Sequence, residues 1–261
     1  MNCAVNEIFG PTIQGEGILT GEPSIFVRFN GCNLRCCFKG GSICDTAYTS
    51  HHPEEAKYQT TDSVAEKVKS IKKGYPNVKN IVFTGGEPML QQDAMCQIID
   101  QLGTDYIYTV ETNGTIVLKE NMRKKIDLWS ISPKLSNSCY FEGHDIPQSI
   151  QEYHKRIRKN YPAVWSYMED NYNTQIKFVY TDRETEDEIV KWVHDFQEWI
   201  KNNKTNRFKK EQKLNILIMP EGEIEEQINR SAKDAVRACV DHGWRYCDRT
   251  HIRIWGNKRA V

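Results

Sequence analysis

The sequence predicts an α/β fold built from parallel β/α units. Short runs rich in β-branched and aromatic residues recur along the 261-residue chain. Stretches of helical length with one apolar face lie between several of these runs. This alternation is typical of a parallel sheet with helices packed against it. The length predicts one or two domains, and a hydrophobic fraction of 39% is enough for a sizeable core.

The elements are expected in a regular order along the chain. The expected strands are Ile25–Phe29, Ile81–Thr84, Tyr106–Val110, Leu128–Ile131, Ile176–Val179, Leu214–Met219 and Ile252–Trp255. The expected helices are Asp62–Lys73, Met89–Leu102, Glu184–Lys201 and Glu223–His242. Asp62 is expected to cap the first helix, and Gly103 and Gly243 lie where glycine commonly ends a helix.

Two segments interrupt this alternation and are interpreted as insertions in a single domain, 1–261. The first, about 136–173, is rich in aromatic residues, so we expect it to pack, including at a subunit interface. The second, about 201–213, is rich in lysine and is expected to be a solvated loop.

The charge composition argues against nucleic acid and membrane lipid as binding partners. Lys and Arg number 35, as do Asp and Glu, so the formal net charge is zero. A broad surface that binds nucleic acid or anionic lipid would need a basic excess. No apolar run approaches the roughly 18 residues of a membrane span, and no secretory signal is apparent. We therefore expect a cytoplasmic protein that binds a small molecule. In the cytoplasm its thiols are expected to be reduced.

The strongest chemical signal is a cysteine-rich loop after the first expected strand. Four of the nine cysteines, Cys32, Cys36, Cys37 and Cys44, lie within thirteen residues. Such a loop can direct separate thiolates at the irons of a polynuclear cluster. Zinc is the alternative, but the adjacent Cys36 and Cys37 cannot easily both face one tetrahedral ion. Three ligands and one remaining thiol fit better and would leave one iron of a four-iron cluster open.

Polar, glycine-containing or proline-containing segments follow several other expected strands. In β/α arrays, functional sites form where the carboxyl ends of successive strands meet. We therefore expect one site assembled from segments that are far apart in the sequence. The segments are Gly85-Gly86-Glu87-Pro88, Glu111-Thr112-Asn113-Gly114, Ser132-Pro133-Lys134 and Met219-Pro220-Glu221-Gly222.

Together, these motifs and the cysteine loop resemble the radical S-adenosylmethionine enzymes. Within that superfamily, Gln14-Gly15-Glu16-Gly17, Cys44-Asp45-Thr46 and the tail 251–259 are similar to the 7-carboxy-7-deazaguanine synthase family. The resemblance runs nearly end to end and is weakest between about 136 and 213. It implies an incomplete, TIM-like β/α barrel with helical insertions, and a homodimer.

The resemblance also implies a reaction. Cys32, Cys36 and Cys44 would hold a 4Fe-4S cluster whose open iron binds S-adenosylmethionine. A donor such as flavodoxin or ferredoxin would reduce the cluster, and cleavage of the cofactor would give a 5′-deoxyadenosyl radical. This radical would take hydrogen from 6-carboxy-5,6,7,8-tetrahydropterin, which loses nitrogen and contracts to 7-carboxy-7-deazaguanine, a precursor of queuosine-type deazapurines. The cofactor carries this chemistry, so no catalytic residue is assigned.

Site residues follow from the same resemblance. Those implied to bind the pterin are Gln14, Gly15, Glu16, Arg28 and Thr84. Those implied to line the S-adenosylmethionine pocket are Gly86, Ser132, Pro133, Lys134, Met219, Pro220, Glu221 and Gly222. The planar fork of Arg28 suits the substrate carboxylate. Thr46 matches a Mg²⁺ ligand of the family. Lys177 is expected on the inner face of a strand, with structural and functional roles equally open.

The cysteine spacing departs from the family. Three and then two residues usually separate the ligands, whereas seven residues separate Cys36 from Cys44 here. Cys36 is expected to be the second ligand and Cys37 the remaining thiol; if Cys37 were the ligand, the position of Thr46 would become doubtful. Two other functions stay open: another radical enzyme, such as a glycyl-radical activase, and a zinc-stabilised binding module.

Overall fold

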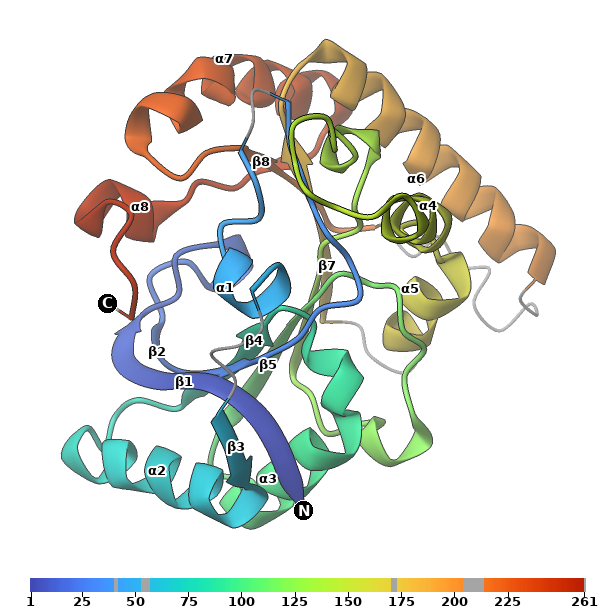
Figure 1. The fold of residues 1–261 in the computed structure, drawn as a ribbon. Helices are drawn as coiled ribbons and strands as arrows, with labels where there is room; N and C mark the ends of the chain where they lie inside the picture. The colour runs from blue at the N-terminus through green and yellow to red at the C-terminus, as the bar shows by residue number, and fades with distance from the viewer. Residues whose placement is uncertain (40–41, 53–56, 170–172, 204–213, 261) are drawn as a thin grey trace.

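The computed structural model describes residues 1–39, 42–52, 57–169, 173–203 and 214–260 (Figure 1). The strands are β1 (Asn2–Ile13), β2 (Pro23–Phe29), β3 (Lys57–Thr60), β4 (Asn80–Gly85), β5 (Ile107–Thr112), β6 (Leu128–Ile131), β7 (Thr174–Tyr180), β8 (Ile216–Pro220) and β9 (Arg245–Tyr246). The α-helices are α1 (Ala47–Ser50), α2 (Thr61–Gly74), α3 (Gln92–Leu102), α4 (Gln148–Ile157), α5 (Tyr161–Met168), α6 (Arg183–Asn203), α7 (Glu225–His242) and α8 (Thr250–Trp255). Short 3₁₀ helices are η1 (Gly17–Leu19), η3 (Pro88–Gln91), η4 (Glu120–Met122) and η5 (Ser136–Ser138).

The described strands form one sheet that follows chain order over most of its width. The order is β3-β1-β2-β4-β5-β6-β7-β8-β9. From β2 to β9 every neighbouring pair is parallel, whereas β1 pairs antiparallel with both β2 and β3. Because β3 and β9 are the two edges, the sheet is not closed. The α/β class and the incomplete β/α barrel are therefore confirmed.

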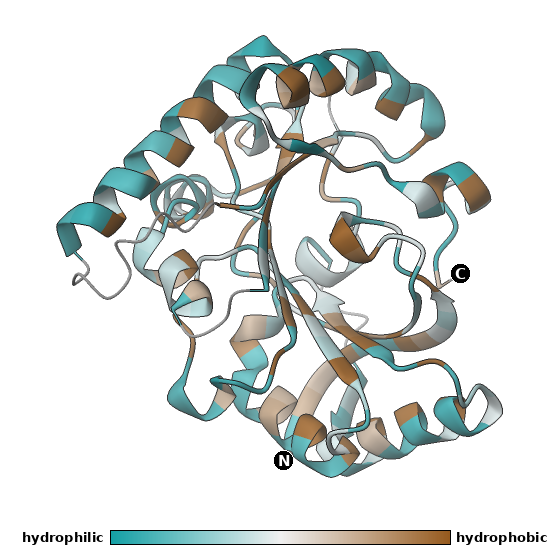
Figure 2. Cartoon of the chain, turned by 180° about the vertical axis from the view of Figure 1, so that it is seen from behind, coloured by the Kyte–Doolittle hydropathy of each residue, from teal (hydrophilic) through white to brown (hydrophobic). Residues whose placement is uncertain are grey.

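Burial explains why the central strands contain nearly continuous apolar runs. Ile81, Val82 and Phe83 of β4 are fully buried, and so is Ile218 of β8. Strands covered on both faces do not alternate apolar and polar side chains. The helices turn their hydrophilic faces outward and their apolar faces toward the sheet (Figure 2). No helix in the described ranges has the length and apolar character needed to cross a membrane.

Two expectations about local structure are wrong, and some strands were not predicted. Ile252–Trp255 belongs to helix α8 and is not a strand; β9 already forms this edge of the sheet, and a short apolar–polar alternation is ambiguous between the two structures. Asp62 does not cap α2, because the Thr60 hydroxyl accepts from Ser63 N at 3.1 Å. The sequence interpretation also missed the strands β1, β3 and β9. Gly103 and Gly243 do follow α3 and α7 as expected.

The first insertion packs against the rest of the chain. Between β6 and β7 it forms η5, α4 and α5, which lie beside α6 (Figure 1). Phe141, Trp165 and Tyr167 are buried, whereas Tyr140 and Tyr153 are partly exposed, at 41% and 39%. The aromatic content therefore mainly serves packing within the chain. Most of the second insertion, residues 204–213, lies outside the described ranges.

Candidate active site

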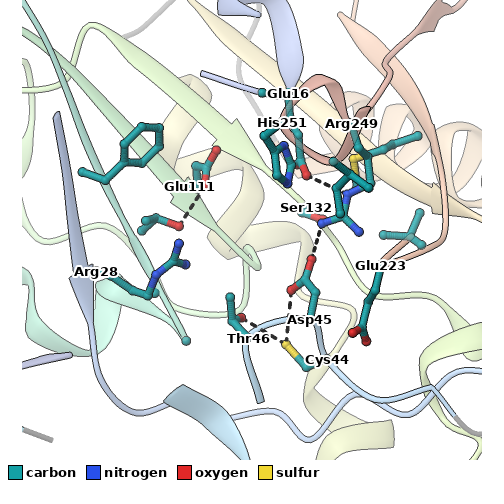
Figure 3. Close-up of a pocket in the computed structure, with 18 of the residues that line it drawn as sticks. Glu16, Arg28, Cys44, Asp45, Thr46, Glu111, Ser132, Glu223, Arg249 and His251 are labelled. Carbon is teal, nitrogen blue, oxygen red and sulfur yellow. Dashed lines mark hydrogen bonds and ion pairs between the residues drawn. The ribbon is translucent and has the colours of Figure 1, made fainter. Parts of the chain in front are cut away.

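A cavity of about 500 Å³ lies where the predicted motifs meet. It is lined by segments from β1 to the C-terminal tail, and Figure 3 shows part of its wall. The predicted residues that line it are Gln14, Gly15, Glu16, Arg28, Cys32, Cys36, Cys44, Thr46, Thr84, Gly86, Ser132, Lys134, Met219, Glu221 and Gly222. Pro133 and Pro220 are buried and are not among its lining residues. The structure thus brings together nearly all of the predicted site.

The widened cysteine loop keeps Cys36 and Cys44 side by side. A bridge between Cys37 and Ile43 closes the base of the seven-residue excursion. Next to this bridge, Cys44 N donates to Cys36 O at 3.1 Å. Cys37 is fully buried, does not line the cavity, and its amide donates to Ser138 O at 3.0 Å. Cys36 and Cys44 are therefore neighbours in space although seven residues separate them in the sequence.

Three free thiols, those of Cys32, Cys36 and Cys44, border the same cavity. Burial raises the pKa of all three, that of Cys32 to about 12, whereas Lys134 acts in the opposite direction on Cys32 and Cys36. Thiolates in this position need a cationic partner, which iron ions would supply. Among the described residues, no group of three His, Cys, Asp or Glu side chains could hold a single metal ion. Three cysteines line the cavity, and three thiolates suit a cluster of several irons, whereas a structural zinc site needs four closed ligands.

A network of alternating charges, in which the two cations Lys177 and Arg249 are buried, forms one side of the cavity (Figure 3). Glu16 pairs with Lys177 and with Arg249, whose Nε lies 3.0 Å from Glu16 Oε1. Arg249 also pairs with Asp45 and donates to Gly222 O. Burial alone would raise the pKa of Glu16 and Asp45, but the neighbouring cations hold both values below the usual range. Both carboxylates are therefore charged at neutral pH.

A second side of the cavity is built around Arg28. Its Nε donates to Glu7 Oε1 at 2.7 Å, and its guanidinium carbon lies 5.4 Å from the ring centroid of Phe9 and 5.9 Å from that of Tyr48. The ion pair uses one edge of the guanidinium, and the rings limit its movement. Arg28 is thereby fixed in the cavity wall.

Glu111 links two of the predicted substrate-binding residues. Gln14 Nε2 donates to Glu111 Oε1 at 3.1 Å, and Thr84 Oγ1 donates to Glu111 Oε2 at 2.7 Å. The carboxylate therefore fixes the orientation of an amide and a hydroxyl that both line the cavity.

Hydroxyl groups accompany the cysteine loop and the end of β6. Thr46 Oγ1 lies 3.3 Å from Cys44 Sγ. On the other side, Lys134 Nζ donates to Ser132 Oγ at 2.8 Å and to Ser132 O at 3.0 Å. A cation and hydroxyl groups thus border the same cavity as the three thiols.

Beneath the cysteine loop, Glu87 joins the ends of β4 and β5. This fully buried carboxylate accepts hydrogen bonds from Met89 N at 2.9 Å, Thr112 Oγ1 at 2.8 Å and Asn113 N at 2.6 Å. Burial raises its pKa to about 6, although these donors favour the ionised form. The glutamate of the Gly-Gly-Glu-Pro motif is therefore structural: it fixes the backbone on which the cysteine loop rests.

Gly86 makes the closest approach to the cysteine loop, and Gly86→Ala tests this contact. A Cβ at position 86 would overlap Gly31 O and lie 2.9 Å from the Cys32 Cβ. We expect Gly86→Ala to lower the free energy of unfolding by about 1–3 kcal/mol and to reduce the iron bound after anaerobic reconstitution. Gly74→Ala is the control, since nothing lies within 4 Å of its Cβ position. Equal iron content in both variants would contradict the prediction.

Sequence reasoning left several of the lining residues without a role. Asp45 and Glu111 lie inside the motifs named above, and His251 lies in the tail. Their positions in these motifs could therefore have identified them as site residues. Arg249 lies two residues before the tail, and no local pattern marks it. Burial lowers the pKa of His251, which packs against Gly15.

Comparison with known proteins gives consistent matches. Residues 13–138 match a family model described as a 4Fe-4S single cluster domain. The chain is 36% identical over 256 residues to the 7-carboxy-7-deazaguanine synthase of Halobacterium salinarum, covering 97% of this chain and 90% of that protein. Identity to the 7-carboxy-7-deazaguanine synthase of Rhodopirellula baltica is 32% over 249 residues, with coverages of 95% and 85%. The crystal structure of QueE from Escherichia coli has the same fold, with a TM-score of 0.58, 19% identity and coverages of 96% and 95%.

Proposed function

Because the chain belongs to the 7-carboxy-7-deazaguanine synthase family of radical S-adenosylmethionine enzymes, we propose that its cavity converts 6-carboxy-5,6,7,8-tetrahydropterin to 7-carboxy-7-deazaguanine. One observation carries this proposal. The three thiols of Cys32, Cys36 and Cys44 and the charged residues Glu16 and Arg28 border the same cavity. The proposed cluster site and the proposed polar substrate site therefore lie in the same cavity.

Cys32, Cys36 and Cys44 are the proposed ligands of a 4Fe-4S cluster. When bound, the cluster and S-adenosylmethionine supply one-electron chemistry that starts with removal of hydrogen from the substrate. Three protein ligands leave one iron for the amino and carboxylate groups of the cofactor. Lys134, held by Ser132, places a positive charge near the Cys36 thiol and would favour binding of the cofactor carboxylate.

Glu16 and Arg28 are proposed to hold opposite ends of the pterin. The ionised Glu16 accepts hydrogen bonds from N–H groups, and Lys177 and Arg249 keep it charged and oriented. Arg28 presents its remaining N–H groups to the substrate carboxylate while Glu7 holds its Nε. Gln14 and Thr84, fixed by Glu111, add polar contacts between these two ends. The protein thus orients the carbon that loses hydrogen.

Thr46 is proposed to bind Mg²⁺ together with substrate oxygens and water, as the octahedral preference of the ion requires. Thr46 and the preceding Asp45 both line the cavity. We expect Thr46→Val to lose the stimulation of turnover by Mg²⁺ and at least about 90% of activity, equivalent to about 1.4 kcal/mol, with iron content unchanged. Assays with and without Mg²⁺ measure this. Undiminished Mg²⁺ stimulation in the variant would exclude Thr46 as a ligand.

The decisive experiment is anaerobic reconstitution with iron and sulfide, followed by addition of S-adenosylmethionine, reductant, Mg²⁺ and 6-carboxy-5,6,7,8-tetrahydropterin. Mass and ultraviolet spectra of the product are expected to identify 7-carboxy-7-deazaguanine. If 5′-deoxyadenosine forms without this product, the radical class stands and the proposed substrate is wrong. A colourless, iron-free protein after reconstitution would remove the basis of the proposal.

The proposal includes a homodimer, a single domain over 1–261 and a cytoplasmic location. Nine free cysteines suit a reducing compartment. The homodimer rests on the family, because most aromatic side chains of the insertion are used for packing inside the chain. Sedimentation velocity measures the oligomeric state directly.

A further inference from the structure

A second hollow lies on the outer side of the cysteine loop. This outer groove, of about 440 Å³, is lined by Asn33, Leu90, Thr115, Tyr153, Arg156 and Lys159 among others. It shares no lining residue with the main cavity. However, Asn33 directly follows the proposed cluster ligand Cys32. The outer groove is therefore the other face of the wall that carries the proposed cluster.

That wall is one layer of hydrogen-bonded side chains thick. Asn113 Nδ2 lies 3.9 Å from Cys32 Sγ and donates to Asn33 Oδ1 at 2.9 Å. Asn33 Nδ2 in turn donates to Thr115 Oγ1 at 2.8 Å. Cys32 and Asn113 line the cavity, whereas Asn33 and Thr115 line the outer groove. A continuous polar contact thus connects a proposed cluster thiolate to the protein surface.

The helix that forms one side of the outer groove is fixed to the cysteine loop. His154 of α4 is fully buried, and its Nδ1 accepts from Arg35 N at 3.1 Å. Its Nε2 lies 3.0 Å from Ser138 Oγ. Tyr153 and Arg156, on the same helix, are therefore held at a constant position relative to Cys36. Figure 1 shows α4 next to α5 on this outer side.

The lining of the outer groove combines exposed apolar surface with positive charge. Leu90 is 49% exposed and Tyr153 39%. Among its lining residues the charged ones are Arg156 and Lys159, and none is acidic. Lys159 pairs with Asp195 at 3.0 Å, whereas Arg156 lies over the ring of Tyr153, 5.4 Å from its centroid, and makes no ion pair among the described residues. The formal net charge of the whole chain is zero, so the positive charge of Arg156 and Lys159 in this lining is local to the groove.

We propose that the outer groove docks a small acidic electron-carrier protein of the flavodoxin kind, which reduces the cluster through this wall. The carrier loses one electron and is oxidised, and the cluster gains that electron and is reduced. A small, partly apolar contact beside the cationic Arg156 suits a transient complex with an acidic electron carrier. This inference rests on the proposed function only in requiring a cluster at Cys32, Cys36 and Cys44.

Charge reversal in the outer groove tests the inference. Arg156→Glu is compared with wild type and with Lys67→Glu, the same charge change at an exposed position on α2. Titration calorimetry measures binding of oxidised flavodoxin to the reconstituted proteins, and loss of visible absorbance measures cluster reduction by reduced flavodoxin. We expect Arg156→Glu to weaken binding and slow reduction about ten-fold or more at low salt, equivalent to about 1.4 kcal/mol, while Lys67→Glu matches wild type. Reduction by dithionite should be equal in all three proteins.

Tyr153→Ser is a second variant and should slow reduction by flavodoxin while keeping the dithionite rate. Wild-type rates with flavodoxin in both groove variants would overturn the inference. An equally slow reduction by dithionite in the variants would also overturn the inference, because it would show damage to the cluster site itself. A change in sedimentation without a change in reduction would overturn it too, and would assign the groove to binding a second copy of the chain. Cluster reduction needs no pterin, so a wrong substrate would leave every one of these results unchanged.

Discussion

Cys36→Ala is expected to lose the cluster, whereas Cys37→Ala is expected to keep the full iron content. The Cys36 thiol borders the cavity together with those of Cys32 and Cys44, while Cys37 is buried outside it. Removing one of three thiolate ligands leaves an iron without its protein ligand. Iron and sulfide analysis, with the visible spectrum after anaerobic reconstitution, measures the difference. Turnover is expected to be undetectable in Cys36→Ala.

Cys37→Ala is the matched control for Cys36→Ala, since each substitution removes one sulfur and the two positions are adjacent and buried. Cys37→Ala leaves a small cavity, for which we expect a cost of about 1 kcal/mol in the free energy of unfolding. Iron loss in Cys37→Ala with retention in Cys36→Ala would reverse the assignment. Equal loss in both would show that the loop, rather than one thiol, determines cluster binding.

Lys177→Met is expected to have the second largest effect. It removes one of the two cations that pair with the buried Glu16 and leaves Arg249 shared between Glu16 and Asp45. Breaking a buried ion pair from one side costs about 3–5 kcal/mol. We expect a loss of that order in the free energy of unfolding and a KM for the pterin at least about ten-fold higher. Denaturant unfolding and steady-state kinetics measure the two effects, and Lys191→Met, at an exposed pair on α6, is the control.

A double variant separates the effect of this ion pair on stability from its effect on turnover. In Glu16→Gln combined with Lys177→Met, both partners of the pair are neutral, so much of the stability lost in Lys177→Met should return. Turnover should not return, because Glu16 is the proposed pterin acceptor. Recovered turnover would show that the network only stabilises the fold, and unchanged stability in Lys177→Met would show that the pair contributes nothing.

Most of the sheet could be predicted from the sequence because its central strands are short, apolar and separated by amphipathic helices. The cysteine loop and the strand ends could be predicted for a related reason: in a parallel sheet, the carboxyl ends of neighbouring strands meet. β1 was missed because its burial is uneven and Gly10 and Pro11 interrupt it. Ile252–Trp255 was assigned to a strand because four residues contain too little periodicity to decide between a strand and a helix.

The charged network could not be predicted, because its pairs join residues far apart in the chain. Glu16 and Arg249 are 233 positions apart, and Glu16 and Lys177 are 161 apart. A lysine in a strand or an arginine in a loop has no local pattern that indicates a buried partner. The closing of the widened loop by Cys37 and Ile43 depends likewise on Cys139, a residue of the distant first insertion.

The cavity is bordered by both ends of the chain, and this has a consequence for biosynthesis. Gln14, Gly15 and Glu16 come from the first strand region, and Arg249 and His251 from the last helix region. A nascent chain still held in the ribosome tunnel has the cysteine loop outside but lacks the wall that Arg249 completes. A chain that stops before Arg249 therefore contains the cysteine loop but lacks one wall of the cavity beside it.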